Sequence, residues 1–347
     1  MPAIINLQRK ENRRRAEMDD VRYTASRISV AESPHQFPKT VTTPRQNWFC
    51  CPISLSGMLS GTCLLFALFA TAAAQAANRP TTLTILDLGD SNFARTATDK
   101  LRGGFKSIDA LTLLDSDLGR AAAKGAGYSG SLNMFVSEAR DLGAALSSDF
   151  YLIGDAQTIR RSSSAKPVYY ESYCSLFVIS SRSGKLARWE RLSFDADTPQ
   201  LAEEKLLSQL NQSFIQSVGL SIKQTQGTEQ AERSVINVDA PLIQEAPDDE
   251  KTAEAEGLRL PKPFQRLRPE YPQSAAKADA EATVDVLVDV EANGEVGGVE
   301  VVRWAGFGLD EATVATVRQL HFFPAMRNGA PVPLRVLLRY NFRKPPK

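Results

Sequence analysis

The sequence predicts an α+β protein with three parts: one hydrophobic helix, an exported α/β sandwich domain, and a small C-terminal domain of order ββαβ. Three observations predict this organisation. Residues 46–78 contain no charged side chain, residues 82–220 alternate strand-like and helix-like patterns, and residues 283–342 begin and end with apolar and polar alternation. A period of two residues is typical of a strand with one buried face, and alternating strands and helices are typical of α/β layers.

The hydrophobic segment, residues 48–77, is predicted to be a transmembrane helix or a signal peptide. Its densest stretch, MLSGTCLLFALFATAAA at residues 58–74, approaches the roughly 20 apolar residues that cross a bilayer. Residues 1–47 contain nine Lys or Arg against five acidic residues. They are expected to be a disordered basic arm in the cytoplasm, or an N-terminal extension that results from a wrongly assigned start codon.

Two locations follow from this segment. An uncleaved helix gives a single-pass protein of the inner membrane with its C-terminal domains in the periplasm. The sequence Ala-Gln-Ala at 74–76 also resembles a signal-peptidase site. Cleavage near Ala76 would give a protein secreted to the periplasm. Both interpretations export everything that follows.

Residues 82–220 are predicted to form an α/β domain with a mixed sheet. Its expected elements are strand 82–88, helix 92–105, strand 111–115, helix 133–148, strand 150–157, hairpin strands 168–180 and 186–194, and helix 199–217. Strands that alternate with helices and then close in a hairpin give parallel and antiparallel neighbours in one sheet. Residues 221–262 are rich in Gln, Glu, Asp and Ala and contain no aromatic side chain, which predicts a flexible linker.

Residues 263–347 are predicted to form the C-terminal domain. In TVDVLVDV, residues 283–290, the valines share one face, while Asp285 and Asp289 mark a solvent-exposed face. Asn293 and Gly294 predict a two-residue hairpin turn with positive φ values. A returning strand, 296–303, a helix from Leu309, and a last strand that alternates through Phe342 complete the domain.

This order, with these residues, resembles the TonB C-terminal domain family over about residues 265–345. The matching segments are RPEYPQSA (268–275), ANGEV (292–296) and GLDEATVATVRQLHFFPAMRNGAPV (308–332), together with the alternating strands. The resemblance implies docking by β-strand addition, in which a segment of an outer-membrane transporter or another periplasmic protein pairs with an exposed sheet edge. It also implies energy-dependent transmembrane transport, with an inner-membrane proton-channel complex or a second copy of the chain as further partners.

The expected partner-binding residues lie on the last strand and on the Pro-Tyr-Pro flank before the first. They are Pro269, Tyr271, Pro272, Val332, Leu334, Arg335, Val336, Leu337, Leu338, Arg339 and Tyr340. An edge strand offers unpaired N–H and C=O groups to a guest. The alternative for the prolines is a stiff lead-in to the first strand, and the alternative for the arginines is a plain solvated face.

Two departures from the family pattern leave energy coupling open. Members that transduce the proton-motive force carry a Ser/His pair within the membrane helix, whereas residues 49–77 contain no histidine. A globular domain also replaces most of the usual Pro/Lys/Glu spacer, and residues 82–220 resemble, more weakly, the small α/β domain of TolB-type and CsgG-type envelope proteins. The alternative function is a secreted periplasmic binding or scaffold protein without energy transduction.

No catalytic, cofactor-binding or metal-binding residue is predicted, and the protein is expected not to be an enzyme or to bind nucleic acid. The net charge is only +1, which lacks the basic excess of a nucleic-acid-binding protein. LDLGDSN, residues 86–92, resembles a GDSL-type esterase motif, but neither histidine, His35 or His321, is placed to activate Ser91. Asp90 or Ser91 is instead predicted to cap the following helix.

Overall fold

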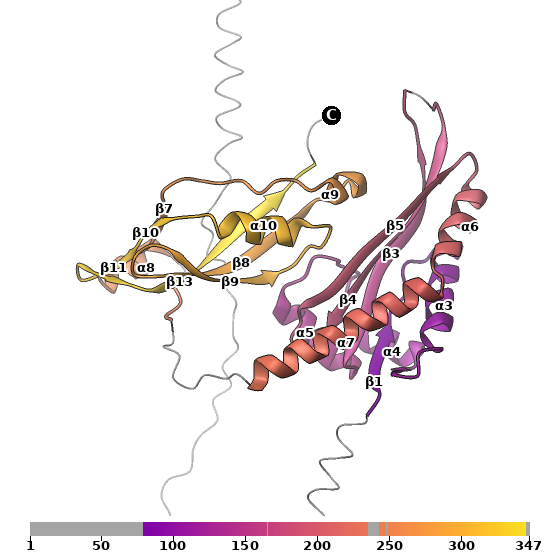
Figure 1. Cartoon of the computed structure of the whole chain (residues 1–347), viewed down its shortest axis with the longest axis horizontal. Coiled ribbons are helices and arrows are strands. Elements are labelled where there is room, and N and C mark those ends of the chain that lie inside the picture. The colour runs from indigo at the N-terminus through magenta and orange to yellow at the C-terminus, as the bar shows by residue number, and fades with distance from the viewer. Residues whose placement is uncertain (1–78, 165, 235–242, 248, 345–347) are drawn as a thin grey trace, which may run out of the picture. The chain divides into compact units, whose positions relative to one another are not determined.

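The computed structural model describes residues 79–164, 166–234, 243–247 and 249–344. The predicted hydrophobic segment 48–77 and the arm 1–47 lie outside these residues. Within the described residues, no helix combines the length and the apolar composition needed to cross a membrane. They form the predicted mixture of helices and strands, an α/β domain followed by a smaller C-terminal α+β domain (Figure 1).

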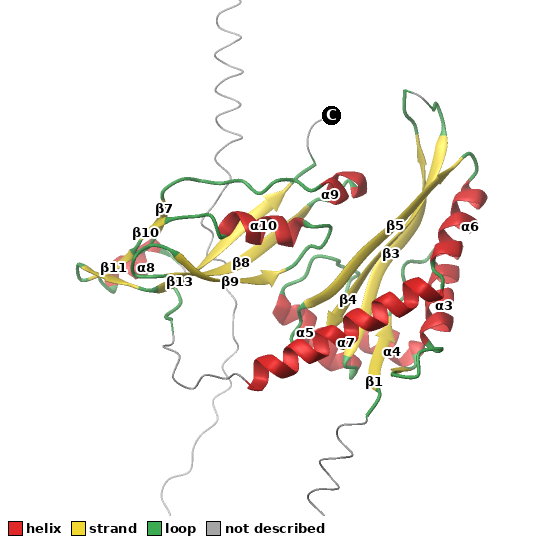
Figure 2. Cartoon of the chain, in the orientation of Figure 1, coloured by secondary structure: helices red, strands yellow, loops and turns green. Residues whose placement is uncertain are grey.

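A five-stranded mixed sheet of order β2-β1-β3-β4-β5 is the centre of the first domain. Its strands are β1 (Thr81–Ile85), β2 (Leu111–Leu113), β3 (Phe150–Arg161), β4 (Tyr169–Ser180) and β5 (Leu186–Ala196). Strand β1 pairs in parallel with β2 and β3, whereas β3, β4 and β5 pair antiparallel. These three are the long strands of this domain in Figure 2, and the mixed sheet expected from the sequence is confirmed.

Helices cover both faces of this sheet. One face packs against α3 (Asn92–Phe105), α6 (Pro199–Gln209) and α7 (Gln212–Ser234), and the other against α4 (Ser116–Gly125) and α5 (Val136–Leu146). The predicted cap of the first helix is confirmed, because Ser91 Oγ accepts a hydrogen bond from the Ala94 N–H at 3.0 Å.

The structure differs from the predicted linker, 221–262, at both of its ends. Helix α7 continues to Ser234, because Ile222 is buried in the core and the Gln- and Glu-rich sequence that follows has good helix propensity. The sequence predicts a single helix over 199–217, whereas the structure has two helices there, α6 and the start of α7. At the other end lie α8 (Glu250–Ala255) and two short strands, β6 (Leu258–Arg259) and β7 (Lys262–Pro263), which pair with residues near 322–327.

The C-terminal domain is built on a three-stranded antiparallel sheet of order β13-β8-β9. Its strands are β8 (Ala282–Val290), β9 (Val296–Arg303) and β13 (Leu334–Phe342). The helices are α9 (Gln273–Ala278) and α10 (Leu309–Val317), and short strands β10 (Phe322–Phe323), β11 (Ala325–Arg327) and β12 (Ala330–Val332) precede β13. The ββαβ order is therefore present, with three short strands added between the helix and the last strand (Figure 1).

The valine face of β8 forms the core of this domain, as predicted. Val284, Val286, Val288 and Val290 are all 0% exposed. They pack in one apolar cluster with Leu309 and Val317 of α10 and with the buried Leu334 and Val336 of β13. The alternation in the sequence thus correctly identified the buried face.

The opposite face of β8 is not the open, solvated face that the sequence predicts. Asp285 is 0% exposed and accepts two hydrogen bonds from the Arg339 guanidinium, at 2.7 and 2.9 Å. Asp289 likewise accepts two hydrogen bonds from the Arg335 guanidinium, at 2.5 and 2.9 Å. Each arginine lies directly opposite its aspartate in the β13–β8 register, which brings the side chains together.

The hairpin between β8 and β9 also differs from the prediction. Only Gly294 has a positive φ, +87°, and Asn293 does not. The Gly294 N–H donates to the Glu291 carbonyl, and the Glu291 N–H donates to the Glu295 carbonyl, both at 2.9 Å. The loop is therefore a three-residue connection in which glycine takes the left-handed position, the arrangement next most common after two-residue turns.

The two Arg–Asp pairs should differ in their contribution to stability. Replacing Arg339 by Leu leaves the buried Asp285 carboxylate without a partner. Breaking such a pair costs about 3–5 kcal/mol, and because 22% of the Arg339 side chain is exposed, we expect a loss of about 3 kcal/mol in the free energy of unfolding. Arg335→Leu should cost about 1 kcal/mol, because the Arg335 and Asp289 side chains are 32% and 16% exposed. Urea unfolding of both variants measures the difference, and equal losses would contradict it.

Candidate functional site

The unpaired side of β13 is the candidate site. Strand β13 pairs with β8 without interruption from Leu334, opposite Val290, to Phe342, opposite Ala282. In an antiparallel pair, successive residues direct their N–H and C=O groups alternately towards the partner strand and away from it. Because the Arg335 main chain bonds to residues outside this sheet, Leu337, Arg339 and Asn341 also direct their main chains away from β8.

Part of this edge is already occupied by the protein's own chain. Residues 243–247 run beside the start of β13 and form a parallel bridge between Glu245 and Arg335. The Arg335 N–H donates to the Gln244 carbonyl, and the Ala246 N–H donates to the Arg335 carbonyl, both at 2.8 Å. The segment lies inside the predicted linker, and we call residues 243–247 the edge segment.

Beyond Arg335 the edge is open within the described residues. The N–H and C=O groups of Leu337, Arg339 and Asn341 have no main-chain partner in that part of the chain. Three outward positions remain, spanning residues 337–341. They offer three donors and three acceptors to an extended guest chain.

The predicted residues of the last strand divide into two groups. Leu334, Val336, Leu338 and Tyr340 lie on the core side, and their main chains are directed towards β8. These four residues therefore cannot pair with a guest through their main chains. The prediction includes every residue of the strand from Leu334 to Tyr340. Arg335, Leu337 and Arg339 belong to the outward group; Val332 ends β12, ahead of β13.

The Pro-Tyr-Pro flank lies at the far end of β13. The Tyr271 hydroxyl donates to the Ala280 carbonyl at 2.6 Å, and its ring lies 6.4 Å from that of Phe342. Pro272 is the N-cap residue of α9, and Pro269 is partly buried. These contacts fit a stiff lead-in to β8 for Pro272 and place Tyr271 beside the end of the edge strand.

Sequence reasoning missed two parts of the site. Asn341 is directed outward like Arg339, and the two-residue period of the strand could have identified it. The edge segment could not be found in this way, since three polar or small residues in a linker carry no strand pattern. Gln244, Glu245 and Ala246 pair because of where the chain passes, not because of their own propensity.

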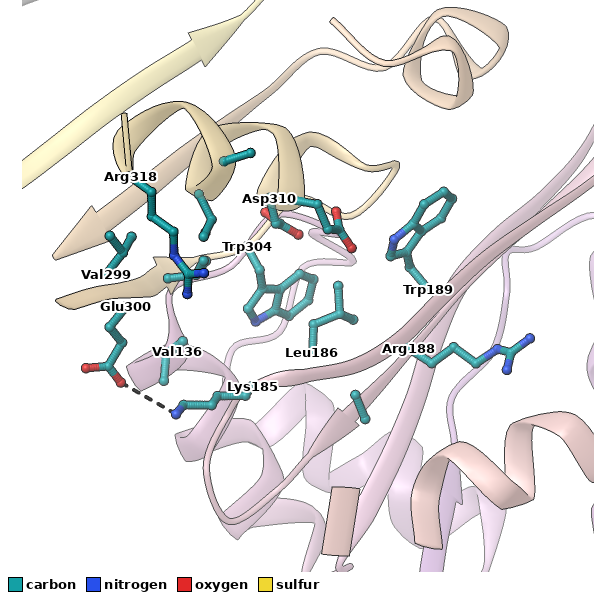
Figure 3. Close-up of a pocket in the computed structure, with 15 residues that line it drawn as sticks. Val136, Lys185, Leu186, Arg188, Trp189, Val299, Glu300, Trp304, Asp310 and Arg318 are labelled. Atoms are coloured by element: carbon teal, nitrogen blue, oxygen red, sulfur yellow. Dashed lines mark ion pairs between the residues drawn. The ribbon is translucent and has the colours of Figure 1, made fainter. Parts of the chain in front are cut away.

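A second surface is a cleft of about 930 Å³ lined by β5, β9 and α10. Figure 3 shows Trp304, Leu186 and Trp189 along it, with Arg318 and Glu300 near one end. Lys185 and Glu300 form an ion pair across that end, at 3.7 Å. Apolar side chains line the cleft together with the charged side chains of Lys185, Arg188, Glu300, Asp310, Glu311 and Arg318.

Asp310 holds the loop that follows Trp304, and both residues line this cleft. Its two carboxylate oxygens accept hydrogen bonds from the Ala305 and Gly306 N–H groups, each at 2.8 Å. The loop places the Trp304 indole 6.0 Å from the Phe177 ring, and Trp304 Nε1 donates to the Gly184 carbonyl at 3.1 Å. Burial raises the pKa of Asp310 to about 7, although the two N–H bonds act in the opposite direction.

The remaining candidates for chemistry are structural. The Ser91 hydroxyl accepts the N-cap hydrogen bond of α3 from the Ala94 N–H. Cys174 is buried, which raises the pKa of its thiol to about 12 and keeps it protonated. Among the described residues, no group of three His, Cys, Asp or Glu side chains could hold a metal ion.

The C-terminal domain is an antiparallel sheet of order β13-β8-β9 whose core face packs against α10 and α9. Residues 268–343 match the model of the Gram-negative bacterial TonB protein C-terminal family. These residues form a TonB C-terminal domain, as the sequence predicts. A domain of this family indicates an envelope protein that acts through protein–protein contacts.

Three solved structures illustrate what the chain is similar to. The C-terminal domain of TonB from Pseudomonas aeruginosa is 20% identical, with a TM-score of 0.22, and the match covers 25% of this chain and 89% of that one. Lipoprotein GNA1162 from Neisseria meningitidis is 11% identical, with a TM-score of 0.29 and coverages of 40% and 99%.

The C-terminal domain of LpoB from Salmonella enterica is 16% identical, with a TM-score of 0.24 and coverages of 35% and 90%. No curated protein matches the sequence of this chain. The resemblance of residues 82–220 to TolB-type and CsgG-type domains stays a prediction.

Stability should fall as the pH rises through the range in which Asp310 titrates. The folded protein keeps a proton on this carboxyl up to about pH 7, whereas the unfolded chain loses it near pH 3.9. Between these values the folded state binds more protons, so stability falls with rising pH, by at most about 1.4 kcal/mol per unit.

Urea unfolding at pH 5, 6, 7 and 8 tests this expectation. Asp310→Asn does not titrate and should remove this part of the slope, although it loses one acceptor at every pH. Parallel pH profiles for the wild type and the variant would contradict the assignment.

Proposed function

We propose that this protein docks partner proteins by β-strand addition at the open edge of β13, residues 337–341. The observation that carries the proposal is the set of outward main-chain groups on Leu337, Arg339 and Asn341, which lack main-chain partners among the described residues. An extended guest can satisfy these groups, and its main chain then supplies affinity while its side chains supply selectivity.

The guest that best fits the domain is a short extended segment of an outer-membrane transporter. The TonB C-terminal domain at residues 268–343 supports this choice. In the proposed role, the protein supports energy-dependent transport across the outer membrane, and it performs no catalytic step. An inner-membrane proton-channel complex is the partner that such a role requires.

A second function, a secreted periplasmic scaffold without energy transduction, is favoured by one observation. Residues 49–77 contain no histidine, and the sequence thus lacks the Ser/His pair expected of a proton-coupled membrane helix. The docking edge would serve this function equally well. The two functions differ in the fate of residues 48–77.

The mature N-terminus should separate these two functions. We propose that residues 48–77 stay attached as a single membrane anchor, with the folded domains in the periplasm. Intact-mass measurement of the protein from membrane and soluble periplasmic fractions should then find the uncleaved chain in the membrane fraction. Finding a soluble chain that begins near Ala77 would contradict the membrane anchor and support the secreted scaffold.

Amide spectra should locate the guest on the strand. Synthetic copies of periplasm-facing N-terminal segments of outer-membrane transporters, titrated into the labelled protein, should shift the amides of Leu337, Arg339 and Asn341 more than those of Leu338 and Tyr340. Leu337→Pro removes an outward donor without removing a bond to β8. We expect it to weaken binding about tenfold, the value of one or two lost hydrogen bonds.

Leu337→Ala is the matched control, because it keeps the N–H group and should bind close to the wild-type level. Spectra that stay unchanged with every transporter segment would contradict docking at this edge. Equal weakening in the Pro and Ala variants would show that the side chain, and not the main chain, makes the contact.

A further inference from the structure

The edge segment occupies the position that a guest strand would take at Arg335. It provides one acceptor, the Gln244 carbonyl, and one donor, the Ala246 N–H, at 2.8 Å each. These are the two bonds that one outward residue of β13 would make with an added parallel strand. Within the described residues, the pairing ends there, and Leu337 is the first open position.

Side chains also hold the edge segment in place. The Arg327 guanidinium donates to Gln244 Oε1 at 2.6 Å, and Ala246 packs against the core of the C-terminal domain. The Glu245 carboxylate contributes, after Asp289 and Glu300, to the raised pKa of Arg335. The segment is therefore seated by specific contacts and not only by proximity.

These contacts are nevertheless few. Gln244 and Glu245 are exposed, and only Arg335 pairs with the segment. Short exposed pairings of this kind belong to the part of a protein that opens at low free-energy cost.

We propose that the edge segment is an internal competitor for the docking edge. A guest confined to residues 337–341 binds beside it, whereas a longer guest that also pairs with Arg335 must displace it. This proposal rests on the proposed function, because the edge segment would regulate docking at the same edge of β13. It makes the segment a device that selects guests by length and register.

Proline substitutions in the edge segment test the proposal in the full chain. Ala246→Pro removes the donor N–H that bonds to Arg335. Glu245→Pro is the matched control, since the Glu245 N–H does not take part in the two bonds with Arg335. Hydrogen exchange followed by mass spectrometry should show the Arg335 amide exchanging about tenfold faster in Ala246→Pro, and close to the wild-type rate in Glu245→Pro.

Synthetic transporter segments of five and nine residues provide the binding test. The nine-residue peptide should bind Ala246→Pro about tenfold more tightly than the wild type, which corresponds to about 1.4 kcal/mol. The five-residue peptide should bind both proteins equally. Unchanged melting temperatures in both variants would show that the domain itself is intact.

The outcomes separate the two proposals. If Ala246→Pro leaves both the Arg335 exchange rate and the affinity for the nine-residue peptide unchanged, the edge segment is not a competitor, whatever the five-residue peptide does. If neither peptide protects the amides of Leu337, Arg339 and Asn341 in any variant, docking at the edge fails. Faster Arg335 exchange in that case would still show that the segment covers the strand, but not that it competes with a guest.

Discussion

The uninterrupted pairing of β13 with β8 determines what each side of the last strand can do. Nine consecutive residues, from Leu334 to Phe342, keep one register. This register directs the side chains of alternate residues into the core and their main chains towards β8. The intervening residues, with polar or solvent-facing side chains, present their main chains to the open edge. A shift of one residue would exchange the two sets and remove both the core and the edge.

The same register neutralises the charge that the last strand would otherwise present. Arg335 and Arg339 lie opposite Asp289 and Asp285, and both pairs are bidentate. Guanidinium groups held in this way are not free to attract an acidic guest over a distance. In the proposed docking, recognition at this edge would therefore depend on main-chain pairing and on local side-chain fit. A plain solvated face, the alternative considered for these arginines, does not describe them.

Elements with a regular period could be predicted from the sequence, and contacts without one could not. The valines of β8 and the alternation of β13 identified the buried face, and Ser91 identified the start of α3. The carboxylates of Asp285 and Asp289 also alternate, but the pattern does not reveal that arginines from a strand about 50 residues later cover them. The edge segment, the loop at Trp304 and the long end of α7 depend on tertiary contacts that no local pattern records.

An open strand edge is a hazard as well as a binding site, because it can pair with any extended chain. The protein covers one outward position with Gln244 and Ala246 and leaves three. A segment rich in β-branched residues would pair more strongly and close the edge permanently. The short, polar composition of residues 244–246 gives the opposite balance, since it protects the start of the strand while remaining displaceable. The linker composition that predicts flexibility is thus also the composition that a reversible cover requires.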